Sequence, residues 1–195
     1  WQSLRHRCQL DDIAGLYDPG AGRCVKAGTS SELRRATLDE GGGSRTLFIK
    51  KYWYPTFRER WSGATRGTLF GMAKAEREYR NLVRLREWGL DAPTPVAFGL
   101  AYSFGWLQRS AIVSEAVPAA RSLDLYIRDE LASVTGPGRR AIRQALIGNL
   151  ARCSARMHDR RFVHNDFYWR NILISHGSLQ RFYLIDAHRD RKSTR

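Results

Sequence analysis

The residues best suited to chemistry lie near the C-terminal end of the chain, where polar residues meet two short apolar runs. The first run, 172–174, follows a stretch of the form H-x-D-x-x-x-x-N over residues 164–171. The second run, 183–185, is followed directly by Asp186. Carboxylate and amide oxygens are the ligands that Mg²⁺ prefers, and a carboxylate beside a hydroxyl can take its proton.

Phosphoryl transfer from ATP is a reaction that needs this set of groups. It requires a carboxylate beside the acceptor hydroxyl and oxygen ligands for Mg²⁺ on the phosphates. We therefore expect Asp166 to receive the hydroxyl proton, and Asn171 and Asp186 to bind Mg²⁺. The alternative is a polar loop between two strands, because Asp and Asn are common turn formers and such a pattern also arises by chance.

A strand that could carry a phosphate-binding lysine is predicted over residues 46–52. Lys50 and Lys51 must point to opposite faces of this strand, because side chains alternate along a strand. We expect Lys50 to meet the α- and β-phosphates, because it directly follows the apolar run 47–49. Lys51 is expected to be exposed to solvent.

A helix is predicted from about Ala73 to Trp88, with an apolar stripe and Gly89 as its stop. Glu78 on this helix is expected to pair with Lys50 and hold it on the phosphates. Glu76 is the competing carboxylate, and a solvated helix side chain is the alternative for either residue. The separation of 78 − 50 = 28 residues is explained by an insertion over residues 53–71.

Four further strands and two turns complete a predicted five-stranded antiparallel sheet. The strands are expected at residues 24–27, 32–38, 46–52, 96–99 and, as one hairpin arm, 106–108 with 111–117. The turn at 28–31 could cover phosphates through the backbone N–H groups and hydroxyls of Gly28 and Ser30, or be an ordinary hairpin turn. A second turn is predicted at 41–44.

The segment 114–118 is predicted to link two lobes. There the Glu115 C=O and the Val117 N–H are expected to meet the adenine edge of ATP. Asp124 opens the next helix, which Ser122 caps, and it could meet the ribose or simply favour the helix N-terminus.

Beyond this helix, Gly136-Pro137-Gly138 is expected to break the chain, and an apolar stripe from Ile142 to Met157 predicts a long core helix. The predicted class is α+β, with an N-terminal lobe over 1–117 and a mostly helical, truncated lobe over 118–195.

Composition excludes few partners. The formal net charge of +14 favours polyanionic partners such as an anionic membrane surface, phosphorylated substrates or nucleic acid. No recognition motif supports nucleic acid, so we expect none. The three cysteines fit a reducing compartment, and no apolar run is long enough to cross a bilayer. The start at Trp1 suggests a piece of a longer protein.

The predicted groups occur once each and in the order found in protein kinases: lysine, helix glutamate, linker, long helix, H-x-D-x-x-x-x-N and aspartate. The chain resembles the protein-kinase-like superfamily and, within it, the bacterial lipopolysaccharide kinases that phosphorylate Kdo or heptose. The segments that carry the resemblance, which covers roughly residues 22–190, are Phe48-Ile49-Lys50-Lys51-Tyr52, Glu76-Arg77-Glu78-Tyr79-Arg80-Asn81-Leu82 and Val163-His164-Asn165-Asp166-Phe167-Tyr168.

The resemblance implies an ATP-dependent kinase with Mg²⁺ that acts on a sugar hydroxyl of the lipopolysaccharide core. It also implies a substrate-positioning role for Arg170, an acidic glycolipid as acceptor, and a cytoplasmic location, peripheral on the inner membrane. The net charge of +14 fits an acidic glycolipid at a membrane. The alternatives are an aminoglycoside- or choline-type phosphotransferase and a nucleotide-binding pseudokinase; the intact Lys50, Asp166, Asn171 and Asp186 argue against the second.

The chain departs from the protein-kinase pattern at two places. Asn165 stands where protein kinases carry an arginine, so a clamp for an activation-loop phosphate is not expected. Asp186-Ala187-His188 replaces D-F-G, so a switch driven by a phenylalanine is not expected either. Nine residues follow Asp186, so most helices of a kinase C-terminal lobe are outside this chain.

Overall fold

The computed structural model describes residues 13–17, 20, 22–40, 43–54, 72–175, 181–187 and 190–192 of the chain. The chain divides into two compact units, Trp1–Arg80 with Thr94–Ala116 and Asn81–Pro93 with Val117–Arg195. The expected division between residues 117 and 118 lies one residue from the boundary between Ala116 and Val117. Residues 81–93, which we had placed in the N-terminal lobe, belong to the second unit. One reason is a backbone bond within that unit, from Leu184 N to Asp91 O at 3.0 Å.

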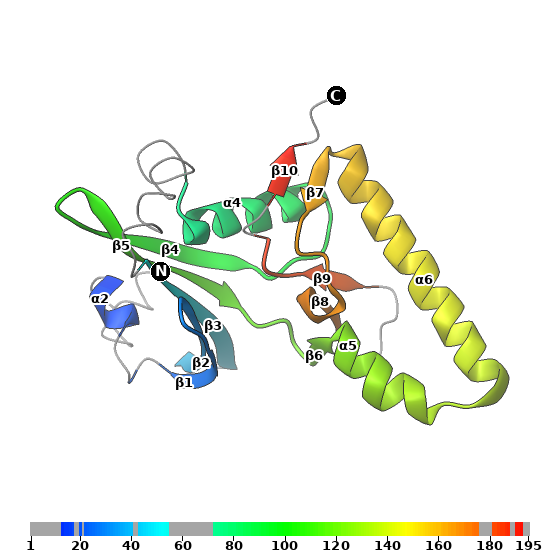
Figure 1. Ribbon diagram of the computed structural model, residues 1–195. Helices are drawn as coiled ribbons and strands as arrows, with labels where there is room; N and C mark the ends of the chain where they lie inside the picture. The colour runs from blue at the N-terminus through cyan, green and yellow to red at the C-terminus, as the bar shows by residue number, and fades with distance from the viewer. Residues whose placement is uncertain are drawn as a thin grey trace. The chain divides into compact units, whose positions relative to one another are not determined.

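The first unit is built on one antiparallel sheet of five strands in the order β1-β2-β3-β5-β4 (Figure 1). The predicted α+β class and five-stranded sheet are therefore confirmed. The strands are β1 (Arg23–Ala27), β2 (Ser31–Glu40), β3 (Gly43–Trp53), β4 (Pro95–Ser103) and β5 (Trp106–Glu115).

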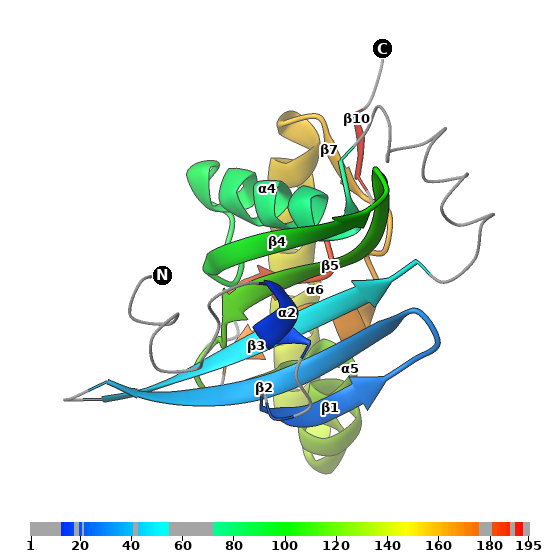
Figure 2. The same cartoon turned by 90° about the vertical axis from the view of Figure 1, so that its left-hand side faces the viewer.

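Strand β3 lies in the middle of this sheet and presents two different faces, because its side chains alternate. On one face, Leu47 and Ile49 pack in a core cluster with Leu16 of the short helix α2 (Ile13–Leu16). Figure 2 shows α2 over that side of the sheet. The Tyr17 hydroxyl, next to this helix, donates to the carbonyl oxygens of Tyr52 and Ser110 at 3.1 and 2.6 Å.

Helix α4 (Lys74–Glu87) matches the helix predicted at 73–88. It ends next to Gly89, whose φ of +71° is the left-handed conformation that glycine adopts at a helix C-terminus. The predicted insertion at 53–71 lies outside the described residues from 55 onward, as do residues 41 and 42 of the predicted turn.

The second unit combines short strands with one long helix, α6 (Gly136–Asp159), drawn in yellow in Figure 1. Its strands form a three-stranded sheet in the order β6-β8-β9 and a two-stranded sheet of β7 and β10. The remaining elements are β6 (Ala120–Ser122), α5 (Leu123–Tyr126), a π-helical turn (Ile127–Leu131), β7 (Phe162–His164), a 3₁₀ turn (Trp169–Asn171), β8 (Ile172–Ser175), β9 (Phe182–Leu184) and β10 (Asp190–Lys192).

Two predictions for this unit were wrong in detail. The Gly136-Pro137-Gly138 stretch begins α6 instead of breaking the chain, because proline is tolerated in the first turn, where its missing N–H has no partner to lose. Ser122 does occupy the N-cap position of α5, but its side chain makes no capping hydrogen bond.

Candidate active site

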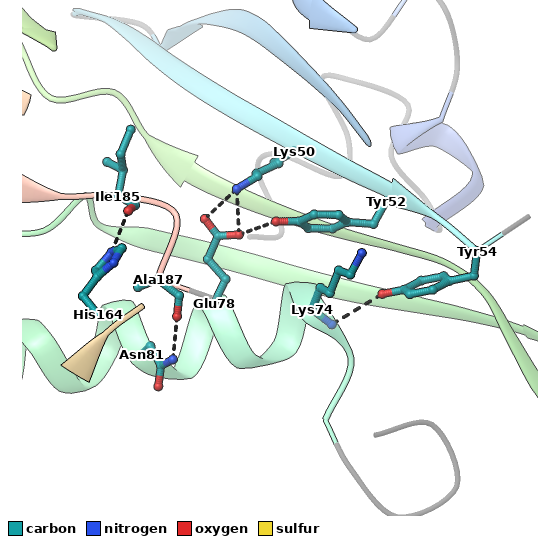
Figure 3. Close-up of polar contacts among 9 residues, drawn as sticks. All are labelled: Lys50, Tyr52, Tyr54, Lys74, Glu78, Asn81, His164, Ile185 and Ala187. Atoms are coloured by element: carbon teal, nitrogen blue, oxygen red, sulfur yellow. Dashed lines mark hydrogen bonds and ion pairs between the residues drawn. The ribbon is translucent and has the colours of Figure 1, made fainter. Parts of the chain in front are cut away.

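The structure brings Lys50 and Glu78 together within the first unit (Figure 3). The Lys50 ammonium lies 3.3 Å from both carboxylate oxygens of Glu78. Strand β3 supplies the lysine and α4 the glutamate, which is buried. The competing carboxylate, Glu76, instead pairs with Arg80 one helical turn later, at 2.7 Å. The pair predicted from sequence therefore exists, and its contact with phosphates stays a prediction.

The expected solvent exposure of Lys51 is wrong. Its side chain is almost completely buried, with 1% of its surface exposed. It lies on the face of β3 opposite Lys50, where its ammonium is 3.8 Å from Glu32 and 5.6 Å from the centre of the Tyr17 ring. The cause is that Tyr17 and α2 cover this face of the sheet. Glu32 is also the direct cross-strand neighbour of Lys51, so the charge is paired.

The turn between β1 and β2 contains the predicted phosphate contacts Gly28 and Ser30. The Gly28 N–H donates to Ser31 O at 2.8 Å, and Ser30 O accepts from Trp53 N at 3.0 Å. A Cβ at Gly28 would lie 3.5 Å from Ser31 O, an ordinary contact, so the turn does not require glycine. Its backbone is that of an ordinary hairpin turn, and a role in covering phosphates stays a prediction.

The predicted adenine contacts lie at the end of β5. The backbone is fixed there by bonds from Glu115 N to Thr94 O and from Ala116 N to Thr46 O, both of 2.8 Å. Within the described residues, the Val117 N–H has no hydrogen-bond partner. Its contact with an adenine nitrogen stays a prediction. Asp124, considered for the ribose, has a buried Oδ1 that likewise lacks a partner in the described part of the chain.

In the second unit, the loop between β7 and β8 folds tightly around Asp166. The carbonyl oxygen of Asp166 accepts hydrogen bonds from Tyr168 N at 2.7 Å and from Asn171 Nδ2 at 2.8 Å. The loop then closes in the 3₁₀ turn Trp169–Asn171. These bonds fix the backbone of Asp166 without using its carboxylate.

Asp186 has an unusual backbone conformation that its neighbours hold in place. Its φ is +62°, the left-handed region, which asparagine and aspartate tolerate better than other side chains. On one side, Ile185 N donates to Asn171 O at 3.0 Å, and Ile185 O lies 2.9 Å from His164 Nε2. On the other side, Ala187 O accepts from Asn81 Nδ2 at 2.6 Å (Figure 3). Left-handed residues whose neighbours are held by hydrogen bonds often occur at functional sites, and a metal-binding role for Asp186 stays a prediction.

The donor set fits Mg²⁺. Because Asn171 Nδ2 donates to Asp166 O, the side-chain oxygen Oδ1 is the atom that could bind a metal, and that role stays a prediction. The backbone bond from Ile185 to Asn171 connects the segment that carries Asp186 to the same loop. Among the described residues there is no group of three or more His, Cys, Asp or Glu that could hold a metal. A pair of candidate protein ligands would suit Mg²⁺, which usually keeps several waters and takes phosphate oxygens as further ligands.

Arg170 lies on the same loop, and its guanidinium is 4.6 Å from the centre of the Tyr168 ring. Tyr168 and Trp169 are exposed over 52% and 57% of their surfaces. Two large exposed aromatic side chains next to Asp166 are a feature that typically marks a binding surface.

Sequence reasoning assigned no role to three side chains that contact predicted site residues or the backbone next to them: Tyr52, Asn81 and His164. Tyr52 could have been found, because it shares the face of Lys50 two residues along the strand. His164 was recognised as part of the motif, but its bond to the backbone before Asp186 was not foreseen. Asn81 gave no signal, because its partner lies 106 residues later.

Comparison with known proteins finds one matching family model and a solved structure with a similar fold. A sequence model of the "Lipopolysaccharide kinase (Kdo/WaaP) family" matches residues 25–195. No curated protein matches the chain in sequence. Among solved structures, one described as "WaaP in complex with acyl carrier protein" is similar, with a TM-score of 0.66 and 22% identity. The similarity covers 97% of this chain and 70% of the other.

Proposed function

Because the chain belongs to the lipopolysaccharide kinase (Kdo/WaaP) family and is therefore a kinase, we propose that it transfers the γ-phosphoryl group of ATP to a Kdo or heptose hydroxyl of the lipopolysaccharide core. The observation that carries this proposal is the Lys50–Glu78 pair at 3.3 Å. A lysine held by a helix glutamate is the arrangement with which kinases bind the phosphates of ATP.

The proposed roles follow from the chemistry of each side chain. Lys50 neutralises charge on the α- and β-phosphates, and Glu78 keeps the ammonium in position. Asn171 Oδ1 and the Asp186 carboxylate would hold Mg²⁺, which neutralises charge that develops on the phosphates. Asp166 orients the acceptor hydroxyl and takes its proton as transfer proceeds.

The nucleotide is expected to make two further groups of contacts. The Glu115 C=O and Val117 N–H would meet the adenine edge, since the Val117 N–H lacks a partner among the described residues. Gly28 and Ser30 would cover the phosphates from the β1–β2 turn.

The loop that carries Asp166 also offers groups for a sugar acid. The exposed rings of Tyr168 and Trp169 present flat apolar surfaces, on which the apolar face of a sugar ring can pack. The guanidinium of Arg170 can pair with a carboxylate or phosphate of an acidic glycan, because its planar array of N–H groups matches those anions. We propose that these three residues contact the acceptor.

The proposed acceptor is embedded in a bilayer, and the protein's charge suits that location. No helix among the described residues is long and apolar enough to cross a membrane. A net charge of +14 attracts the protein to anionic lipids, each basic residue near the surface contributing about 1 kcal/mol. We therefore propose peripheral contact with the anionic cytoplasmic face of the inner membrane.

The function is tested by following labelled phosphate from ATP to defined acceptors. We expect transfer to core glycolipids that carry an unphosphorylated Kdo or heptose, and none to aminoglycosides or choline. We expect faster transfer from anionic vesicles than from neutral ones, with the difference shrinking as salt rises. Preferred transfer to an aminoglycoside or choline would support the small-molecule alternative. ATP binding without transfer to any acceptor would contradict the proposal.

Lys50 and Lys51 provide a matched pair of variants on one strand. Lys50→Met should lower phosphoryl transfer about 10²–10³-fold, the loss typical for removal of one electrostatic contact to the reacting groups. Lys51→Met should leave transfer within a few-fold of wild type but destabilise the fold by about 1–3 kcal/mol, because Lys51 is buried and paired with Glu32. Steady-state kinetics and thermal unfolding measure both effects, and equal losses of transfer would contradict the assignment of Lys50.

A further inference from the structure

Glu78 has a second donor besides Lys50. The hydroxyl of Tyr52 donates to Glu78 Oε2 at 2.7 Å, shorter than either contact of Lys50 with the carboxylate. All three side chains are drawn in Figure 3, where Lys50 and Tyr52 both extend from β3 and meet the carboxylate of Glu78 on α4. Tyr52 and Glu78 are both buried, so removing this donor would deprive a carboxylate oxygen of a hydrogen bond that water could not readily replace, at a cost in free energy.

The geometry of β3 makes this contact possible. Tyr52 follows Lys50 by two residues and therefore shares its face of the strand. The Lys50 ammonium lies 5.4 Å from the centre of the Tyr52 ring, so the ring also forms one wall of the lysine's surroundings. The backbone of Tyr52 is fixed from the other face, where its carbonyl oxygen accepts from the Tyr17 hydroxyl.

From these contacts we infer that Tyr52 is a positioning residue for the reaction: it fixes the Glu78 carboxylate in the orientation that presents both oxygens to Lys50. The inference rests on the proposed function, because it assigns Tyr52 a task only if Lys50 binds phosphates. Without the hydroxyl, Glu78 would lose one of its two donors and could rotate away from Lys50. The lysine would then hold the phosphates less well, while the acceptor side would be unaffected.

The residue directly after β3 provides a matched control. Tyr54 follows Tyr52 by two residues and is likewise buried, but its hydroxyl is 3.0 Å from Ser110 Oγ and accepts from Lys74 N at 3.4 Å. Burial raises the pKa of Tyr54, so its hydroxyl stays protonated at neutral pH. The Lys74 ammonium lies 5.7 Å from the centres of both tyrosine rings, so the two positions share this neighbour as well. Of these two tyrosines, Tyr52 is the one whose hydroxyl donates to Glu78 within the described part of the chain.

The experiment compares Tyr52→Phe with Tyr54→Phe in kinetics and in nucleotide binding by calorimetry. For Tyr52→Phe we expect kcat/KM for ATP to fall about tenfold, the effect of losing one hydrogen bond to a charged group, with KM for the acceptor unchanged. For Tyr54→Phe we expect both constants within twofold of wild type. Equal losses in the two variants, or wild-type kinetics in Tyr52→Phe, would overturn the inference.

A double-mutant cycle separates positioning from a general effect on folding. If Tyr52 acts through Glu78, Tyr52→Phe should have no further effect on kcat/KM in the Glu78→Gln background, whereas independent effects would add. Additive losses would overturn the inference, as would a Tyr52→Phe variant that is unfolded while Tyr54→Phe is folded. If the wild-type protein neither binds ATP nor transfers phosphate, the proposed function itself fails; an active wild type with an unchanged Tyr52→Phe removes only the role of Tyr52.

Discussion

Replacing Asp186 by asparagine is expected to abolish phosphoryl transfer while leaving the protein folded. The substitution keeps the size of the side chain and its tolerance of the left-handed φ of +62°, but removes the charge that would bind Mg²⁺. If metal-assisted stabilisation of the transition state is worth about 4 kcal/mol, its loss lowers the rate roughly 10³-fold. Transfer measured by phosphate label and Mg²⁺-dependent ATP binding measured by calorimetry should both decrease.

Asp186→Ala separates charge from backbone conformation. Alanine removes the same charge and is also disfavoured at positive φ, which costs roughly 1–2 kcal/mol. We therefore expect Asp186→Ala to lose transfer like Asp186→Asn and, in addition, to unfold at a lower temperature. Asp129→Ala, at an exposed position, serves as the control and should retain wild-type transfer. Retained transfer in either variant at position 186 would remove this aspartate from the metal site.

Strand alternation and helix termination made the first half of the candidate site predictable from sequence. Lys50 follows an apolar run, so its strand and face could be deduced, and Gly89 marked the end of α4. Glu78 could be chosen over Glu76 because it lies beside the apolar stripe of the helix. In each case the prediction depends on residues that are close together in the sequence, within the same strand or helix.

The errors and omissions share a different physical cause. The burial of Lys51 depends on Tyr17, which reaches β3 from 34 residues away in the sequence. The left-handed conformation of Asp186 depends on Asn81 and His164, whose partners lie 106 and 21 residues away. Neither contact leaves a periodic pattern in the sequence. Tertiary contacts of single polar side chains therefore had to come from the structure, although they determine how the candidate site is held.

The hydrogen bonds that fix the loop around Asp166 use its backbone, so the proposed role of its carboxylate as general base can be tested without disturbing the fold. We expect Asp166→Asn to lower phosphoryl transfer about 10²–10⁴-fold, the usual cost of losing a general base. The fold should be unaffected, because the hydrogen bonds from Tyr168 and Asn171 use the carbonyl oxygen of Asp166, which the substitution keeps. ATP affinity should change little, since Asp166 is proposed to contact the acceptor and not the nucleotide.

The control for this variant lies next to it on the same loop. Asn165 is exposed, and Asn165→Ala should leave transfer within a few-fold of wild type. Nucleotide binding by calorimetry and transfer to the glycolipid acceptor are measured on both variants and on wild type. Binding that is retained while transfer collapses in Asp166→Asn alone supports the base. Transfer within a few-fold of wild type would exclude it, and lost ATP binding would instead mean that Asp166 is a metal ligand, which its place five residues before Asn171 also allows.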